Sequence, residues 1–260
     1  MKEKKSNRRS IQLQSASFKL YVDNLLMHNS AKELVDYVAQ QVPIYVFSGL
    51  IRNFLLGYLN NRDIDFVLFD TPHLKLPYSL LKDVYIKKNK FGGYKLLTDD
   101  LTIDVWDIER TWGILEERMR ASVNSLLDTA FFNFSAIAYD YHKSKFIFSD
   151  EFEKFYATHV MEVVYERNPK KETCIVNALY YADKYEFIIG NSLRKWIVKY
   201  YNGDYDYKAA QESRFQKILY SDSLIKAFAS ICANPKVYKH GVVSLYDDTK
   251  CVLLRFDKFV

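Results

Sequence analysis

Residues 43–70 decide the fold, and they read P-I-Y-V-F-S-G-L-I-R-N-F-L-L-G-Y-L-N-N-R-D-I-D-F-V-L-F-D. The β-branched and aromatic run at 44–47 predicts a strand. Ser48 and Gly49 then predict a tight turn, and the apolar residues 50–56 predict a short helix. Backbone amides at the start of a helix bind phosphate, so this strand–turn–helix unit is a candidate nucleotide site.

Two aspartates lead into the next apolar run, residues 66–69, which predicts a second strand. Successive side chains on a strand point to opposite faces, so Asp63 and Asp65 share one face while Ile64 packs on the other. Two carboxylates on one face repel each other unless a cation lies between them. Hard oxygen ligands favour magnesium or manganese, which makes this pair a candidate metal site.

A third carboxylate is predicted on residues 101–108, L-T-I-D-V-W-D-I, which form another candidate strand. Alternation places Asp104 on the face opposite Ile103 and Val105. Asp107 falls on the other parity and is the weaker candidate. We predict Asp104 as the third ligand of a two-ion site and as its general base.

Together these motifs resemble the head domain of the CCA-adding enzyme and bacterial poly(A) polymerase family, within the DNA polymerase β-like nucleotidyltransferases. That family carries Gly-Gly-x-Val-Arg-Asp, Leu-Leu-Gly and Asp-x-Asp in this order. The corresponding residues are Ser48-Gly49, Arg52-Asn53, Leu55-Leu56-Gly57 and Asp63-Ile64-Asp65. Residues 132–140, F-N-F-S-A-I-A-Y-D, are similar to the family's Phe-Thr-Ile-Asn-Ala-Leu-Ala-Tyr-Asp, and residues 149–164 resemble its lead into the neck. The resemblance covers about residues 43–187.

The resemblance implies an α+β fold in two domains. Residues 1–150 would form a polymerase β-like nucleotidyltransferase head, a mixed sheet flanked by helices, including N-terminal helices. Residues 151–260 would form a mostly helical, neck-like domain that ends in a β-hairpin. Apolar periodicity predicts its helices and hairpin strands at 172–187, 192–201, 207–219, 223–233, 241–246 and 251–256. We also predict a mobile basic tail over residues 1–12 and one amphipathic helix over 111–127.

The activity implied by the resemblance is metal-dependent and template-independent transfer of a nucleoside monophosphate from a (d)NTP to a hydroxyl. Two magnesium or manganese ions would lie on Asp63, Asp65 and Asp104. Ser48 and Gly49 would contact the β- and γ-phosphates. Arg52 would either meet the triphosphate or pair structurally with an acid.

The neck departs from the family pattern. CCA-adding enzymes read the incoming base there with Glu-Asp-x-x-Arg, where this chain has R-N-P-K-K at 167–171. A lysine does not reproduce the planar fork of arginine, so C and A reading as the family does it is not expected. Asn168 and Lys171 stay candidate contacts to a base or a phosphate of the substrate, for which we favour a purine nucleotide.

No stretch matches the body and tail domains with which the family docks the tRNA elbow, so we expect another acceptor. The architecture resembles compact CCA-like nucleotidyltransferases of antiphage defence, which make short oligonucleotide signals. This resemblance implies an effector protein partner and a tyrosine primer near the C-terminus. Tyr238 and Tyr246 are the candidates among 21 tyrosines. The alternatives are a tRNA 3′ end, a protein or small-molecule hydroxyl, or a non-catalytic nucleotide sensor.

Composition sets the broad class. With 260 residues, 49% of them hydrophobic, the chain is long enough for a stable core without disulfides. A net charge of +5 is compatible with a polyanionic ligand. The three cysteines are scattered and in no metal-ligand spacing, which indicates reduced thiols and a cytoplasmic protein. No apolar run predicts a signal peptide or membrane insertion.

Overall fold

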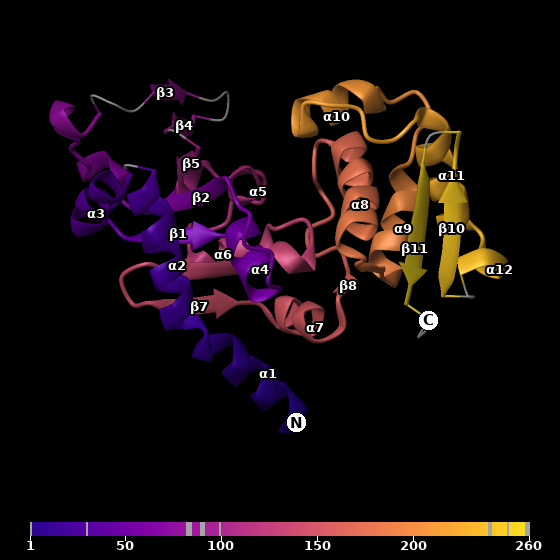
Figure 1. Ribbon diagram of the computed structural model, residues 1–260, viewed down its shortest axis with the longest axis horizontal. Helices are drawn as coiled ribbons and strands as arrows, with labels where there is room; N and C mark the ends of the chain where they lie inside the picture. Colours follow the sequence, from indigo (N-terminus) through magenta and orange to yellow (C-terminus); the bar gives the residue numbers. More distant parts are fainter. Residues whose placement is uncertain are drawn as a thin grey trace. The chain divides into compact units, whose positions relative to one another are not determined.

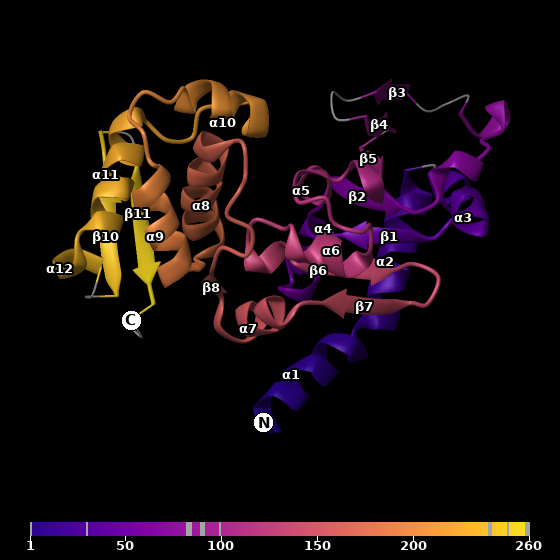
Figure 2. The ribbon, with the colours of Figure 1, turned by 180° about the vertical axis from the view of Figure 1, so that it is seen from behind.

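The structure is a computed structural model that describes residues 2–29, 31–81, 85–88, 92–98, 100–238, 241–248 and 250–257 (Figures 1 and 2). The chain divides into two compact units. The head unit comprises Met1–Ala130 and Phe134–Tyr156, and the neck unit comprises Phe131–Asn133 and Ala157–Val260. The sequence prediction placed the boundary between residues 150 and 151. Three neck residues, 131–133, therefore lie within the sequence of the head.

The head unit is built on a seven-stranded sheet with the order β3-β4-β5-β2-β1-β6-β7. Its strands are β1 (Ile44–Phe47), β2 (Asp63–Leu68), β3 (Tyr85–Lys88), β4 (Tyr94–Leu97), β5 (Thr102–Asp107), β6 (Ile137–Asp140) and β7 (Lys145–Phe148). β2 and β5 pair in parallel, and the other neighbours pair antiparallel. The sheet is therefore mixed, and the predicted α+β fold class is confirmed.

Helices cover both faces of this sheet. They are α1 (Lys2–Leu13), α2 (Ser15–His28), α3 (Lys32–Gln41), α4 (Gly49–Leu55), α5 (Trp112–Glu116), α6 (Val123–Asp128) and α7 (Asp150–Thr158). On one face, Phe18 of α2 packs edge-on against Tyr139 of β6, with ring centroids 4.8 Å apart. On the other face, Val67 of β2 is buried with Ile114 of α5 and Leu126 of α6. Within the described residues, no helix is long and apolar enough to cross a membrane.

The prediction of a mobile tail over residues 1–12 was wrong for the described residues 2–12, which lie in helix α1. Ile11 is fully buried, which anchors the helix to the head. The Arg8 side chain donates from Nη2 to Asp150 Oδ1 at 2.8 Å and from Nε to Glu153 Oε2 at 3.1 Å. The basic composition of this segment did not predict these ion pairs with α7.

The single helix predicted over 111–127 was also wrong, since the chain breaks it into α5 and α6. Arg118 lies between them in the left-handed region, with φ of 51°, which a continuous right-handed helix does not allow. The Ser122 hydroxyl then accepts a hydrogen bond from the Ser125 amide at 3.0 Å and caps α6. The amphipathic pattern ran across the break because both pieces bury apolar side chains.

The neck unit contains five helices and a four-stranded sheet in the order β10-β11-β9-β8 within the described residues. Its elements are β8 (Val160–Met161), α8 (Lys171–Tyr185), β9 (Ile188–Ile189), α9 (Asn191–Tyr200), α10 (Tyr207–Phe215), α11 (Asp222–Ala233), α12 (Pro235–Tyr238), β10 (Val242–Tyr246) and β11 (Cys251–Phe256). The predicted hairpin of β10 and β11 is confirmed. β8 and β9, with two residues each, are too short to produce a sequence pattern.

One carboxylate organises the start of α9. Glu162 accepts hydrogen bonds from the backbone amides of residues 191, 192 and 193, at 3.1, 2.8 and 3.2 Å, and from the Ser192 hydroxyl. A negative charge at a helix N-terminus is also favourable to the helix dipole. A Cβ at Gly190 would clash with this carboxylate, so a larger residue there would displace it from the helix start.

Candidate functional site

The three predicted carboxylates lie on one face of two neighbouring strands. β2 and β5 pair in parallel, with Asp65 opposite Asp104 and Asp63 opposite Thr102. Paired residues on adjacent strands point to the same face, and the strands of a sheet lie about 4.8 Å apart. Asp63 is exposed, while Asp65 and Asp104 are half-buried. Strand register therefore fixes the face that the acids share.

The same face becomes apolar toward the other end of the two strands. Val67 follows Asp65 by two residues and is fully buried among Ile108, Ile114 and Leu126. Trp106, two residues after Asp104, packs against this cluster. The apolar cover thus ends where the acids begin, and the carboxylates stand at its edge.

Lys95 is a charged neighbour that the sequence prediction missed. It lies on β4 directly opposite Asp104, and its Nζ is 3.0 Å from Asp104 Oδ2. The side chains of both residues are partly exposed, 40% for Lys95 and 29% for Asp104. The sequence did not predict that β4 pairs with β5, and this pairing is what brings Lys95 next to Asp104. The third carboxylate therefore has a positively charged partner in the protein itself.

The donor chemistry of this face fits a hard divalent cation, since three carboxylates are the ligands that magnesium and manganese prefer. Among the described residues, however, no group of three or more His, Cys, Asp or Glu side chains is arranged so that it could hold a metal ion. The Lys95 ammonium already neutralises part of the charge at Asp104. The acids are thus aligned by the strands without being drawn together around one point.

The turn between β1 and α4 has an unusual backbone. Ser48 has φ of 56° and ψ of −102°, a conformation that glycine adopts more readily than serine. Its amide donates to Ile137 O at 2.9 Å, and its carbonyl accepts from the Arg52 amide at 3.0 Å. Gly49 begins α4, and a Cβ there would meet nothing within 4 Å. The space beside Gly49 is therefore open, and backbone strain is concentrated at Ser48.

Arg52 is held by local contacts. It is 4% exposed, donates from Nε and Nη2 to Asn53 Oδ1 at 3.0 and 2.7 Å, and lies 5.0 Å from the centroid of the Phe134 ring. Buried guanidinium groups with such contacts stabilise packing. These contacts give Arg52 a packing role through an amide and a ring, and its predicted contact with a triphosphate or with an acid stays a prediction.

The two candidates in the neck unit also have local partners. Asn168 Oδ1 accepts from the Lys170 amide at 3.0 Å, just before α8 begins. Lys171 Nζ lies 4.5 Å from the Tyr200 ring centroid and 5.6 Å from that of Trp196. Each side chain therefore contributes to the fold around the first turn of α8, whether or not it contacts a nucleotide.

The two candidate primers differ in what is described of them. Tyr246 ends β10 with its side chain 70% exposed. Tyr238 is the last residue of α12, and its side chain lies outside the described part of the structure. A primer residue must be accessible to solvent, and Tyr246 is.

Comparisons with known proteins support the fold. No protein-family model matches the chain, and no curated protein matches it in sequence. Among solved structures, a CCA-adding enzyme complexed with CTP matches at 18% identity and a TM-score of 0.53, over 73% of this chain and 47% of that one. The Thermotoga maritima CCA-adding enzyme complexed with tRNA matches at 18% identity and 0.53, over 80% and 50%. An apo CCA-adding enzyme matches at 17% identity and 0.55, over 87% and 57%.

This chain has the fold of the CCA-adding enzymes. It spans about half the length of the first two structures that it matches, 47% and 50%. At this identity the likeness shows the fold alone.

Proposed function

We propose that this chain is a metal-dependent, template-independent nucleotidyltransferase. It transfers a nucleoside monophosphate from a (d)NTP to a hydroxyl and releases pyrophosphate. The observation that carries the proposal is the placement of Asp63, Asp65 and Asp104 on one face of two register-paired strands. The fold shared with CCA-adding enzymes, one of them complexed with CTP, supports a nucleotide as the substrate.

Different residues of the head unit would bind the phosphates and accept the proton. The backbone at Ser48 and Gly49 would hold the β- and γ-phosphates next to open space. Asp104 would take the proton of the attacking hydroxyl, after leaving the ion pair with Lys95. Lys95 would then be released within reach of the same face, where it can neutralise phosphate charge.

Asp63, Asp65 and Asp104 would hold two magnesium or manganese ions. When bound there, such ions lower the pKa of an attacking hydroxyl and stabilise the leaving pyrophosphate.

Within this activity we propose short oligonucleotides made from one favoured purine nucleotide, as a signal in antiphage defence that acts on an effector protein. Tyr246 is the better described primer candidate, because its side chain is exposed. Transfer to a tRNA 3′ end is the second candidate, because one matched structure is complexed with tRNA.

The test is incubation of the purified chain with each labelled NTP and dNTP, plus magnesium or manganese, without an acceptor. Products are resolved on a denaturing gel before and after protease digestion. A ladder from one nucleotide supports acceptor-free synthesis, and protease-sensitive label supports a tyrosine primer. The Asp63→Ala/Asp65→Ala double variant is the control and should be inactive but folded.

Each negative result has a separate meaning. Incorporation only when tRNA is added would favour the tRNA alternative over oligonucleotide synthesis. Incorporation into a protein or small molecule would move the acceptor to that class. Equal activity in the double variant and the natural chain would contradict the catalytic assignment. Nucleotide binding without any incorporation would favour a sensor.

A further inference from the structure

The head unit contains a cavity of about 490 Å³ on the face of the sheet opposite the carboxylates. Its floor is formed by Phe66 and Leu68 of β2 and by Ile103 and Val105 of β5. These residues alternate with Asp65 and Asp104 along the same strands, so they point away from the acids. The acids therefore do not line the cavity, and of the residues on their face Trp106 borders it at one end.

The walls of the cavity are aliphatic over most of their extent. Helix α3 contributes Leu34, Val35 and Val38, and the chain after β2 contributes Leu74 and Leu76. Three large apolar side chains that line the cavity stay exposed to solvent: Ile86 at 38%, Leu76 at 40% and Tyr94 at 46%. A hollow of this size lies in the range of small-molecule sites, and apolar walls hold ordered water poorly.

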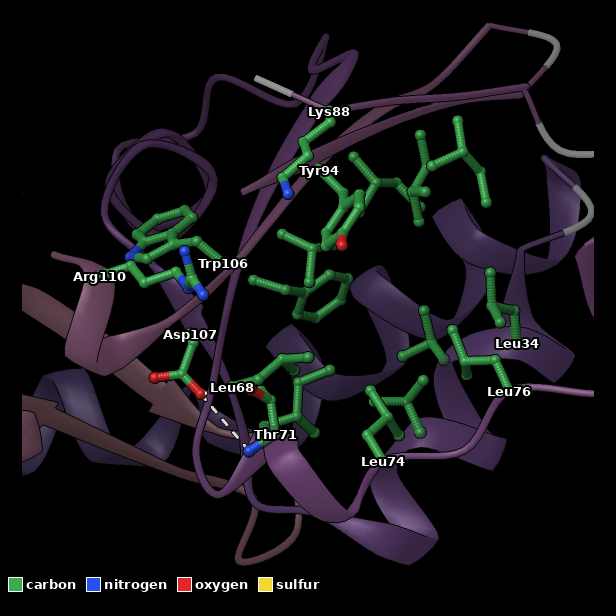
Figure 3. A pocket seen from close by; sticks show the side chains of 18 of the residues that line it. Leu34, Leu68, Thr71, Leu74, Leu76, Lys88, Tyr94, Trp106, Asp107 and Arg110 are labelled. Carbon is green, nitrogen blue, oxygen red and sulfur yellow. Dashed lines mark hydrogen bonds between the residues drawn. The ribbon is translucent and has the colours of Figure 1, made fainter. Parts of the chain in front are cut away.

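Polar groups gather at one end of the cavity. Figure 3 shows Lys88, Tyr94, Trp106 and Arg110 together at that end, while Leu34 and Leu76 lie at the other. The Arg110 guanidinium lies against Gly92, where any Cβ would clash with it. Glycine at 92 thus leaves room for the cation at the mouth.

The charges at this end favour an acid. The one carboxylate in the described lining belongs to Asp107, and both of its oxygens already accept hydrogen bonds. Oδ2 accepts from the Thr71 hydroxyl at 2.5 Å, and Oδ1 accepts from the Glu109 amide at 2.7 Å. Lys88 and Arg110 supply two positive charges against this single negative one.

We propose that this cavity binds an amphiphile with an aliphatic body and one acidic head group, a carboxylate or a phosphate. The body would lie between α3 and the sheet, and the head group would meet Lys88 and Arg110. The aliphatic part of the cavity offers a nucleobase no hydrogen bonds, and neither Asp65 nor Asp104 lines it, so this site is distinct from the one proposed for the nucleotide. It does not depend on the proposed nucleotidyl transfer.

The test is calorimetric titration of the full chain with decanoate, decyl phosphate, 1-decanol and decyltrimethylammonium, each below its aggregation concentration. We expect one decanoate or decyl phosphate per chain, bound at least tenfold more tightly than the cationic probe. The Lys88→Gln/Arg110→Gln variant should bind either acid about tenfold more weakly and 1-decanol equally well. If the carboxylate binds and the phosphate does not, or the reverse, the head group is identified.

Matched variants distinguish binding in the cavity from non-specific binding. Lys87→Gln changes the neighbouring lysine, which points to the other face of β3 and does not line the cavity, and it should leave all affinities unchanged. Leu74→Trp should fill the hollow and abolish binding of decanoate and decanol alike. Three results would overturn the proposal: no binding, unsaturable binding, or equal affinity for acidic and cationic probes. Equal losses in Lys87→Gln and the double variant would overturn it too.

Discussion

The head and neck units place their candidate nucleotide residues in different ways. In the head, Asp63, Asp65 and Asp104 are set by strand register, and their side chains reach an edge where the apolar cover ends. In the neck, Asn168 and Lys171 are engaged around the first turn of α8. The head acids are therefore positioned by the pairing of their strands, whereas the neck candidates are positioned by contacts that their own side chains make.

The largest effect is expected from a pair of substitutions on the two faces of β5. Asp104→Asn should lower the rate of nucleotide incorporation about a hundredfold or more, because it removes the proposed base and metal ligand. Asp107→Asn on the opposite face should keep most of the activity, since it changes only the contacts to Thr71 and Glu109. The measurement is incorporation of labelled nucleotide by variants whose thermal unfolding has been checked. Equal losses would contradict the assignment of faces.

A large effect on stability is expected at the carboxylate that caps α9. Glu162→Ala should reduce the free energy of unfolding by about 2–3 kcal/mol, because it leaves several helix amides without an acceptor. Urea unfolding followed by circular dichroism measures this change. The control is Glu166→Ala, whose side chain is 62% exposed and makes one surface ion pair, with Lys199 at 3.6 Å. If both variants lose the same stability, the cap is not what holds α9.

A substitution of Lys171 tests whether this neck residue has a structural role alone or also contacts the nucleotide. Lys171→Ala should reduce the free energy of unfolding by about 0.5–1 kcal/mol, since it removes a cation from the rings of Trp196 and Tyr200. The KM for the nucleotide, measured on the same variant, decides the remaining role. A rise in KM would support a nucleotide contact as well, and an unchanged KM would leave Lys171 with its structural role alone.

The smallest effect is expected at the strained turn. Ser48→Gly should raise the free energy of unfolding by about 0.5 kcal/mol, because relief of the positive φ outweighs the added freedom of the unfolded chain. Ser230→Gly, at an exposed position in the last turn of α11, is the matched control, and it should lower stability by about 0.5–1 kcal/mol. Denaturant unfolding of both variants gives the two signs. A loss of stability in Ser48→Gly would mean that the serine side chain has a role that offsets the strain.

The strands of the head were predictable because alternation is a local property. Asp63, Asp65 and Asp104 could be assigned to faces from their immediate neighbours, and Asp107 to the other face. The parallel pairing that brings Asp104 opposite Asp65 was not predicted, because Asp104 was chosen only as the third carboxylate that a two-ion site requires. Such pairings join distant segments, and composition does not encode them directly.

The features that escaped prediction depend on contacts between segments far apart in the sequence. Lys95 became part of the site only through the pairing of β4 with β5. The basic start of the chain became a helix because Ile11 is buried in the head. The cavity needs α3, β3, β4 and the chain after β2 at once, so no single stretch carries a sign of it.

The alternation on β2 and β5 has a consequence for how this protein tolerates change in length. A slip of β5 by one residue against β2 would turn Asp104 toward the aliphatic hollow and bring Ile103 or Val105 to the solvent-facing acids. That error would bury a charge and remove a ligand in one step. The number of residues between the two strands therefore determines which side chains face the site. Single-residue insertions there are expected to abolish activity more often than substitutions at the same positions.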